Sequence, residues 1–310
     1  LKPGLFLGSG PEHSGDVTFD SLGVNPEAML DIQPLYRRMD SGSLQAFLPP
    51  RARAAHKGDF GHVLVVGGGP GMPGAAQLCA EAALRSGAGR VSLATHPDHA
   101  ALIPIVRPEL MSYGIASAND LSVLLETADV VAFGPGLGQS EWAHELYTLL
   151  ADYEGLVVWD ADALNRLASA DSPLPSSPMM RVITPHPGEA ARLLATDSTA
   201  IQGDRPAALA QLVEKYGGVV VLKGAGTLVS ADSGPPHVCT AGNPGMAAPG
   251  MGDLLTGVIA ALLANGLELA DAASVGVEIH ARAGDIAAKG GERGMLASDL
   301  LAALRQVVNP

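Results

Sequence analysis

Short apolar runs alternate with longer amphipathic or alanine-rich segments from residue 62 onward. Runs of this kind, continuous in apolar residues and separated by segments of helical length, are typical of buried strands in a mostly parallel sheet. The pattern therefore predicts an α/β fold with helices on both faces of the sheet, and a last third (252–308) that is largely helical. The predicted strands occupy residues 62–67, 90–95, 129–134, 156–160, 181–184 and 218–223.

The first 55 residues follow a different pattern. The stretches GLFLG (4–8) and DVTFDSLGV (16–24) are predicted to form two short strands joined by the turn SGPEHSG. A proline-rich connector with the basic residues Arg51 and Arg53 follows. Because the chain begins LKPGLFLG, without an initiator methionine or a signal peptide, we expect it to lack the start of a longer protein.

Polar, glycine-rich loops follow the predicted strands. Since open α/β sheets bind ligands at the carboxyl ends of their strands, one crevice is expected to receive these loops. They are GGGPGMPG (67–74), GPGLG (134–138), DADAL (160–164), TPHPGE (184–189) and KGAGT (223–227).

Each loop also has a plain structural interpretation. GGGPGMPG can bind an anion at a helix N-terminus, but it lacks the Rossmann pattern and the P-loop lysine, which favours a tight turn. For GPGLG, a turn and a binding loop are equally favoured. Asp160 and Asp162 can hold Mg²⁺ through water, although we favour Asp162 as the cap of the helix that follows.

The last two loops carry a histidine and a lysine. Pro187 and Glu189 fit the first turn of a helix that Thr184 or His186 can cap. We favour a ligand contact for His186, because a histidine between two prolines is rarely a packed core residue. Lys223 with its glycines suits a phosphate, whereas the plain interpretation is a hairpin turn with a solvated lysine.

One aspartate, Asp253, lies where a glycine-rich loop enters an apolar helix predicted to begin at about that residue. Gly250 and Gly252 allow a backbone nest, and the positive end of the helix dipole stabilises both an incoming phosphate and an ionised carboxylate. The stretch therefore predicts an anion hole beside a general base, which can accept the proton of a substrate hydroxyl. The alternative is an ordinary aspartate at a helix N-terminus.

Composition and net charge argue against some classes of function. Hydrophobic residues make up 47% and charged residues 16%, which suits a compact globular protein. A net charge of −13 argues against nucleic-acid binding. No apolar run is long enough for a membrane span. Cys79 and Cys239 are too few for a disulfide framework, so we expect a reducing, cytoplasmic setting.

A series of motifs resembles the NAD(P)H-hydrate dehydratase family of the ribokinase-like superfamily. The resemblance covers residues 56–308 and implies a ribokinase-like fold. The head resembles the last strands of the NAD(P)H-hydrate epimerase domain of bifunctional bacterial proteins, which implies a division into 1–40 (epimerase remnant plus linker) and 41–310 (dehydratase). The motifs, in order, are HKGDFGHVLVVGG, GMPGAA, GPGLGQ, WDADALN, VITPHPGEAARLL, YGGVVVLKGAGT, GNPGMA, GMGDLLTGVIAALL and GMLASDLL.

The resemblance implies a lyase of metabolite repair. Hydrated NADH or NADPH, the S epimer, is returned to the normal cofactor with ADP, or ATP in place of it, as co-substrate. The ring hydroxyl is phosphorylated and phosphate then leaves. Mg²⁺ accompanies the nucleotide, and no metal site built from protein side chains is expected. A homo-oligomer, with a tetramer as the family's state, and no epimerase activity in this chain are further expectations.

The resemblance also assigns site residues. Asp253 is the expected catalytic base and contacts the substrate hydroxyl. The expected NAD(P)H-hydrate site comprises Ala75, Gly136, Gly138, His186, Pro187, Gly188, Glu189, Arg192 and Asp253. The expected nucleotide site comprises Lys223, Gly224, Ala225, Gly226, Thr227, Asn243, Pro244, Gly245, Met246, Ala247, Gly250, Met251 and Gly252.

One position departs from the family pattern. The family usually has MAxGGxGD, whereas this chain has MAAPGMGD, with Ala248 and Pro249. Proline lacks an N–H and has a fixed φ, so nucleotide affinity is expected to fall or the loop to shift. The alternatives are a vitamin or sugar kinase of the same superfamily, such as a hydroxymethylpyrimidine or hydroxyethylthiazole kinase, and a non-catalytic nucleotide sensor. A Rossmann dehydrogenase is disfavoured, because its fingerprint is missing.

Overall fold

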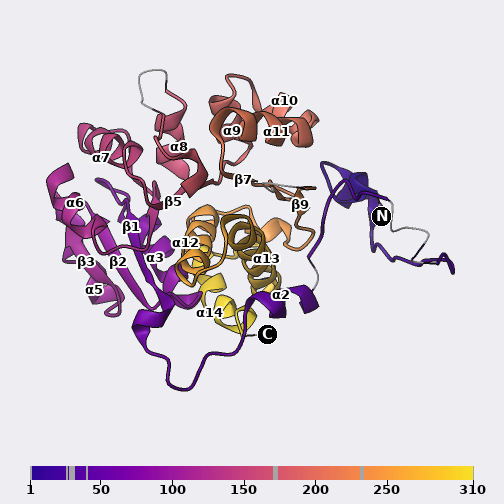
Figure 1. Ribbon diagram of the computed structural model, residues 1–310, viewed down its shortest axis with the longest axis horizontal. Helices are drawn as coiled ribbons and strands as arrows, with labels where there is room; N and C mark the ends of the chain where they lie inside the picture. The colour runs from indigo at the N-terminus through magenta and orange to yellow at the C-terminus, as the bar shows by residue number, and fades with distance from the viewer. Residues whose placement is uncertain are drawn as a thin grey trace.

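The computed structural model describes residues 2–25, 27, 32–39, 41–169, 174–230 and 234–309. Its centre is one sheet with the strand order β3-β2-β1-β4-β5-β6-β7-β8-β9. Strands β1 to β7 pair in parallel, and β8 and β9 are added antiparallel at one edge. Helices cover both faces of this sheet (Figure 1), so the predicted α/β architecture is confirmed.

Each predicted strand from residue 62 onward is present. The strands are β1 (His62–Val66), β2 (Arg90–Thr95), β3 (Met111–Gly114), β4 (Val130–Phe133), β5 (Leu156–Trp159), β6 (Arg181–Ile183), β7 (Val219–Leu222), β8 (Leu228–Val229) and β9 (His237–Val238). The sequence did not predict β3 and β9. Strand β3 is a partly exposed edge strand without an apolar run, and β9 has only two residues.

Alternate strand residues enter two separate cores. Val63 and Val65 of β1 pack with α3, α12, α13 and α14, whereas Leu64 and Val66 pack with α6, α7, α8, α9 and α11. Because both faces are covered, the strands are apolar throughout, which is the pattern that identified them.

The helices supply the two outer layers. Helix α12, which contains the apolar segment after Asp253, lies against α3 and α13. A Cβ on Gly257 would clash with the Cys79 carbonyl oxygen of α3, so this glycine allows the two helices to pack closely. In the described part of the chain, no helix is long and apolar enough to cross a membrane. The α-helices are α1 (Gly10–Ser14), α2 (Ser41–Phe47), α3 (Pro73–Arg85), α4 (Pro97–Ala100), α5 (Ile103–Val106), α6 (Ala118–Leu125), α7 (Glu141–Ala151), α8 (Ala161–Leu167), α9 (Pro187–Leu193), α10 (Ser198–Gly203), α11 (Arg205–Tyr216), α12 (Met251–Ala264), α13 (Leu269–Ala287) and α14 (Ala297–Val307).

The prediction of two strands in the first 24 residues is wrong. Residues Pro3–Leu5 form a 3₁₀ turn, the predicted turn forms α1, and residues 16–24 are exposed and carry no strand. A two-stranded ribbon is only marginally stable without a sheet or helix to pack against, and these stretches have no sheet of their own to join. Phe6 and Leu7 instead lie against Gly226 in the hairpin after β7, and Arg37, further along the chain, forms a parallel bridge with His237 of β9.

Candidate active site

The two glycine-rich loops after β1 and β4 are joined by backbone hydrogen bonds. The Gly68 N–H donates to the Pro135 carbonyl at 3.0 Å, and the Gly69 N–H donates to the Gly136 carbonyl at 2.7 Å. A Cβ on Gly136 would lie 3.0 Å from the Cβ of Ala75, which places Ala75 beside the GPGLG loop. The structure therefore brings together these two predicted substrate-site positions. The first loop also forms the predicted tight turn into α3, which begins at Pro73.

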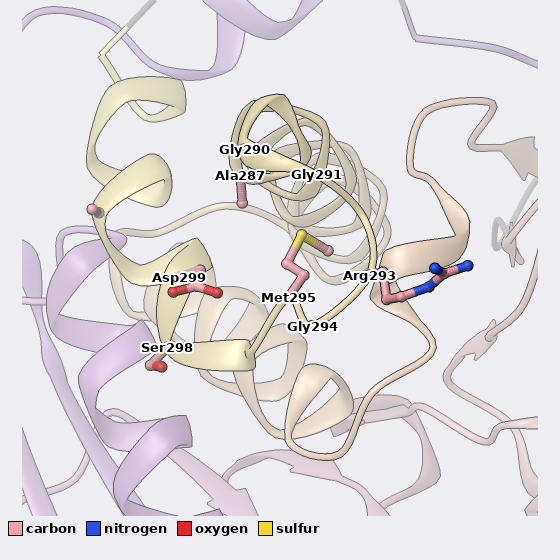
Figure 2. A pocket seen from close by; sticks show the side chains of 9 residues that line it. Ala287, Gly290, Gly291, Arg293, Gly294, Met295, Ser298 and Asp299 are labelled. Carbon is pink, nitrogen blue, oxygen red and sulfur yellow. The ribbon is translucent and has the colours of Figure 1, made fainter.

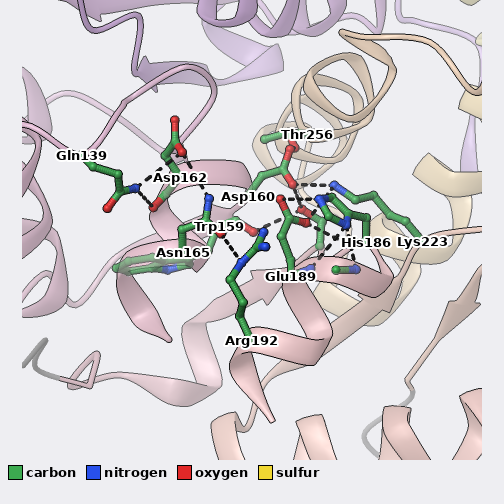
Figure 3. Close-up of polar contacts among 12 residues, drawn as sticks. Gln139, Trp159, Asp160, Asp162, Asn165, His186, Glu189, Arg192, Lys223 and Thr256 are labelled. Atoms are coloured by element: carbon green, nitrogen blue, oxygen red, sulfur yellow. Dashed lines mark hydrogen bonds and ion pairs between the residues drawn. The ribbon is translucent and has the colours of Figure 1, made fainter. Parts of the chain in front are cut away.

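Asp162 links the GPGLG loop to α8 and α9. Its carboxylate accepts hydrogen bonds from the Gly138 N–H at 2.8 Å and from the Asn165 amide at 3.2 Å. Arg192 then donates to the Asn165 amide oxygen at 2.8 Å (Figure 3). The prediction that Asp162 caps the helix is wrong, because α8 begins at Ala161 and Asp160 occupies the N-cap position.

Asp160 and Lys223 form a buried ion pair. The ammonium of Lys223 lies 2.7 Å from Oδ1 of Asp160 and 3.7 Å from Oε2 of Glu189. The hydroxyls of Thr184 and Thr256 each donate to Asp160 at 2.8 Å, so strands β5, β6 and β7 and helix α12 meet at one carboxylate (Figure 3). The expectation of a solvated Lys223 is wrong, although the predicted hairpin between β7 and β8 is present.

Both members of this pair are held in their charged forms. Burial would raise the pKa of Asp160, but the Lys223 ammonium and the hydrogen bonds from Lys223, Thr256 and Thr184 outweigh it and lower that pKa. Burial likewise would lower the pKa of Lys223, and the carboxylates of Asp160 and Glu189 outweigh it and raise that pKa. A buried charge needs such a partner, since its desolvation otherwise costs several kcal/mol.

The start of α9 confirms the predicted cap. The His186 imidazole accepts from the N–H groups of Gly188 and Glu189, Pro187 opens the helix, and the Glu189 carboxylate accepts from the His186 N–H at 2.7 Å. The His186 side chain is half exposed, and its pKa is lowered by burial and by the nearby Lys223. Burial, with help from Asp160, raises the pKa of Glu189 to about 7.

Asp253 lies in the first turn of α12, which begins at Met251, two residues before the predicted start. Gly250 is the N-cap with φ of 88°, a left-handed conformation that favours glycine. The first N–H groups of a helix have no partner within it, so the turn presents free donors. The predicted stabilisation of the ionised Asp253 is outweighed, because burial and the nearby Asp160 raise its pKa to about 7.

The predicted nucleotide segments approach this turn from two sides. A Cβ on Gly252 would lie 3.1 Å from the Lys223 ammonium, so the KGAGT hairpin and the start of α12 are adjacent. Pro244–Met246 form a 3₁₀ turn capped by Asn243. Asp285 ties this segment to α13, because it accepts hydrogen bonds from the Gly242 N–H and the Asn243 amide, each at 3.0 Å. The free N–H groups and one open carboxylate together suit a phosphoryl group and a hydroxyl.

The described residues contain no group of three or more His, Cys, Asp or Glu side chains that could hold a metal ion. The carboxylates of Asp160 and Asp162 are both occupied by internal donors. The donor set therefore fits a magnesium ion that arrives with nucleotide phosphates better than one held by the chain itself.

A hollow of about 530 Å³ lies between the end of α13 and the start of α14 (Figure 2). Its lining includes Arg293, Met295 and Asp299, and none of the predicted site residues. The loop that borders it packs behind the predicted nucleotide segment, because a Cβ on Gly245 would lie 2.8 Å from the Glu292 carbonyl oxygen.

Several residues that hydrogen-bond to the predicted site residues were not predicted from the sequence. Thr256 was not singled out, although it is a hydroxyl three residues after Asp253 in an otherwise apolar helix. Asn165 and Arg205 were not predicted either, because a single polar residue in a helix gives no signal of the hydrogen bonds that it makes. Thr184 was considered only as a cap, whereas its hydroxyl donates to Asp160.

Comparison with known proteins shows the family to which this chain is related. The family model described as NAD(P)H-hydrate dehydratase matches residues 63–306. The chain is 48% identical over its full length to a bifunctional NAD(P)H-hydrate repair enzyme of Coxiella burnetii. It spans 63% of that relative's length.

Two solved structures share the fold over most of the chain. A ribokinase-like superfamily protein from Enterococcus faecalis is 28% identical, with a TM-score of 0.81 over 88% of this chain and 95% of its own. An ADP/ATP-dependent NAD(P)H-hydrate dehydratase from Bacillus subtilis, co-crystallised with ATP/Mg²⁺, is 29% identical. Its TM-score is 0.76 over 86% of this chain and 96% of its own. The ribokinase-like fold expected from the sequence is confirmed.

Proposed function

Because the chain belongs to the NAD(P)H-hydrate dehydratase family, we propose that it restores NADH and NADPH from their (S)-hydrates in a nucleotide-dependent dehydration. The observation that carries the proposal is Asp253 in the first turn of α12, with a pKa near 7, beside free helix N–H groups and the Lys223–Asp160 pair. This arrangement can hold a phosphoryl group and remove a hydroxyl proton at one place.

The proposed reaction has two steps, phosphorylation of the ring hydroxyl and elimination of phosphate. In the first, the ring hydroxyl oxygen attacks the terminal phosphorus of ADP, Asp253 accepts the hydroxyl proton, and AMP leaves. In the second, the C–O bond to the new phosphate breaks and its electron pair leaves with the phosphate, the departing phosphate accepts a proton from the neighbouring ring carbon as the ring double bond forms, and Asp253 releases its proton to solvent. Phosphorylation thus converts hydroxide, a poor leaving group, into a good one.

The roles that the family resemblance implies for the remaining residues are part of the same proposal. We assign Lys223 to Thr227, Asn243 to Ala247 and Gly250 to Gly252 to the nucleotide, with Mg²⁺ supplying charge neutralisation for its phosphates. Ala75, Gly136, Gly138 and residues 186–189 with Arg192 are assigned to the hydrated cofactor. A pKa near 7 suits Asp253 as a base, because the carboxylate is present at neutral pH and still accepts a proton readily.

The wider setting is part of the same proposal. Residues 1–40 form the end of an epimerase domain with a linker, and residues 41–310 form the dehydratase. Cys79 and Cys239 are free, buried thiols, in keeping with a reducing cytoplasm. A homo-oligomer, with four subunits as in the family, completes the proposal.

The test uses the purified chain with NADH hydrate, Mg²⁺ and either ADP or ATP. The account expects reduced-nicotinamide absorbance to return only with a nucleotide, and Asp253→Asn to abolish the return. A stable phosphorylated product would instead indicate a kinase. Binding of ADP without turnover would indicate a nucleotide sensor.

A further inference from the structure

Four carbonyl groups of the hairpin after β7 accept hydrogen bonds from internal donors. Arg205, the first residue of α11, donates to three of them: the Leu222 carbonyl at 3.0 Å, the Lys223 carbonyl at 3.2 Å and the Gly226 carbonyl at 3.3 Å. The Thr227 hydroxyl donates to the Gly224 carbonyl at 2.9 Å. One planar guanidinium therefore holds the beginning and the end of the hairpin loop together.

Arg205 lies directly behind this loop and is 3% exposed. A Cβ on Gly224 would lie 2.9 Å from Nη1 of Arg205, which leaves room only for a glycine. Nη1 also donates to the Gln202 amide oxygen at 2.9 Å. Among the described residues, no carboxylate lies within ion-pair distance of the guanidinium, so its buried charge faces carbonyl and amide oxygens alone. Burial accordingly lowers the pKa of Arg205.

In contrast to these carbonyl groups, three consecutive N–H groups of the same loop have no hydrogen-bond partner among the described residues. The Lys223 N–H donates to the Pro185 carbonyl, but the part of the chain described here offers no acceptor for the N–H groups of Gly224, Ala225 and Gly226. Carbonyls held inward and consecutive amides left free form a concave donor site for an anion. A buried positive charge behind the loop strengthens that preference.

We propose that Arg205 is a positioning residue for the nucleotide: it holds the hairpin carbonyls inward so that the three free amides face the phosphates of ADP. The inference rests on the proposed function, because it takes ADP as the ligand of this hairpin. Arg205 does not touch the nucleotide; it acts through the backbone of residues 222–226.

The chain offers a matched control in Arg181, which is also buried, at 5% exposed, and donates to the carbonyl of Tyr216. Arg181 begins β6 at the amino end of the strand, away from the loops at the carboxyl ends. Arg205→Lys keeps the charge but loses the planar fork that reaches three carbonyls. Arg181→Lys makes the same chemical change outside the site.

The experiment measures the KM of ADP and of NADH hydrate, and the Kd of ADP by calorimetry, in the full chain and both variants. Arg205→Lys is expected to raise the ADP KM and Kd roughly tenfold, at unchanged KM for the hydrate, while Arg181→Lys leaves all three within about twofold. Equal changes in both KM values, or an unchanged ADP Kd, would overturn the inference.

Two further results distinguish a failure of the proposed function from a failure of the role of Arg205. A wild-type chain that binds ADP but does not convert the hydrate refutes the proposed function, and the ADP Kd of the variants still decides the role of Arg205. A wild-type chain that does not bind ADP overturns the inference as well. If Arg205→Lys does not fold, Gln202→Ala decides instead: it removes one acceptor of Nη1, and a two- to threefold rise in the ADP Kd is expected. An unchanged Kd would overturn the inference.

Discussion

The ammonium of Lys223 lies 2.7 Å from Oδ1 of Asp160, beside the turn that opens α12; the Asp160 side chain is buried and the Lys223 side chain is 16% exposed. The pair is the point at which three neighbouring strands and helix α12 meet. The pair and the two hydroxyls that donate to it, those of Thr184 and Thr256, fix the position of the turn that carries Asp253.

Asp160→Asn is expected to lower the free energy of unfolding by about 3–5 kcal/mol, because it leaves the Lys223 charge buried with Glu189 as its remaining partner. Urea unfolding near neutral pH measures the loss. Thr256→Val, which removes one donor and keeps the ion pair, should cost about 1–2 kcal/mol. Equal losses in the two variants would show that the ion pair does not dominate.

The raised pKa of Asp253 makes stability depend on pH. An unfolded aspartate titrates at about 3.9, whereas the folded pKa is about 7. Between these values the folded chain binds more protons, so this contribution to stability is present at low pH and is lost as pH rises through 7. Asp253→Asn should therefore stabilise the chain by about 1–3 kcal/mol at roughly pH 8 and by less at roughly pH 5.

Thermal unfolding of both proteins at the two pH values measures this difference. Glu189, whose pKa is also raised, is present in both proteins, so its own titration contributes to both measurements. A stability difference that is the same at both pH values would contradict the raised pKa of Asp253.

Pro249→Gly should lower the KM of ADP a few-fold. Pro249 immediately precedes the N-cap Gly250, is exposed, and has no N–H to offer a phosphate. The replacement restores that donor. Pro50→Gly, at an exposed proline far away in the sequence, is the control and should leave the KM unchanged. An ADP KM that does not respond to Pro249→Gly would end the idea that this proline weakens nucleotide binding.

Gly226→Ala should destabilise the chain by about 1–2 kcal/mol and raise the ADP KM. Gly226 has φ of 68°, and an added Cβ would clash with the Phe6 carbonyl oxygen and lie 3.0 Å from the Leu7 side chain. The matched control is Gly290→Ala, where an added Cβ meets nothing within 4 Å. Calorimetric unfolding and ADP titration of both variants check the prediction; equal effects would contradict it.

The sequence predicted the fold well because both faces of the sheet are covered, which makes each central strand a continuous apolar run. Strands β3 and β9 lack that signal, and the first 24 residues carry a strand-like pattern without a sheet to join. Local patterns also predicted His186 as a cap of the helix that starts at Pro187.

The partners of the buried charges were not predictable in this way. Asp160 and Lys223 are 63 residues apart, and Asp160 and Thr256 are 96 apart. Their contact depends on the strand order, which places β5, β6 and β7 side by side. The same holds for Arg205, whose three acceptors lie 17–21 residues away in a hairpin.

In the proposed reaction, the ring hydroxyl is phosphorylated before its oxygen leaves the nicotinamide ring. The direct measurement uses NADH hydrate carrying a heavy oxygen isotope in that hydroxyl, with ADP, Mg²⁺ and the full chain, followed by mass analysis of the products. The label is expected in inorganic phosphate, because the ring C–O bond breaks after the oxygen has joined phosphorus. Label found in water instead of phosphate would contradict it.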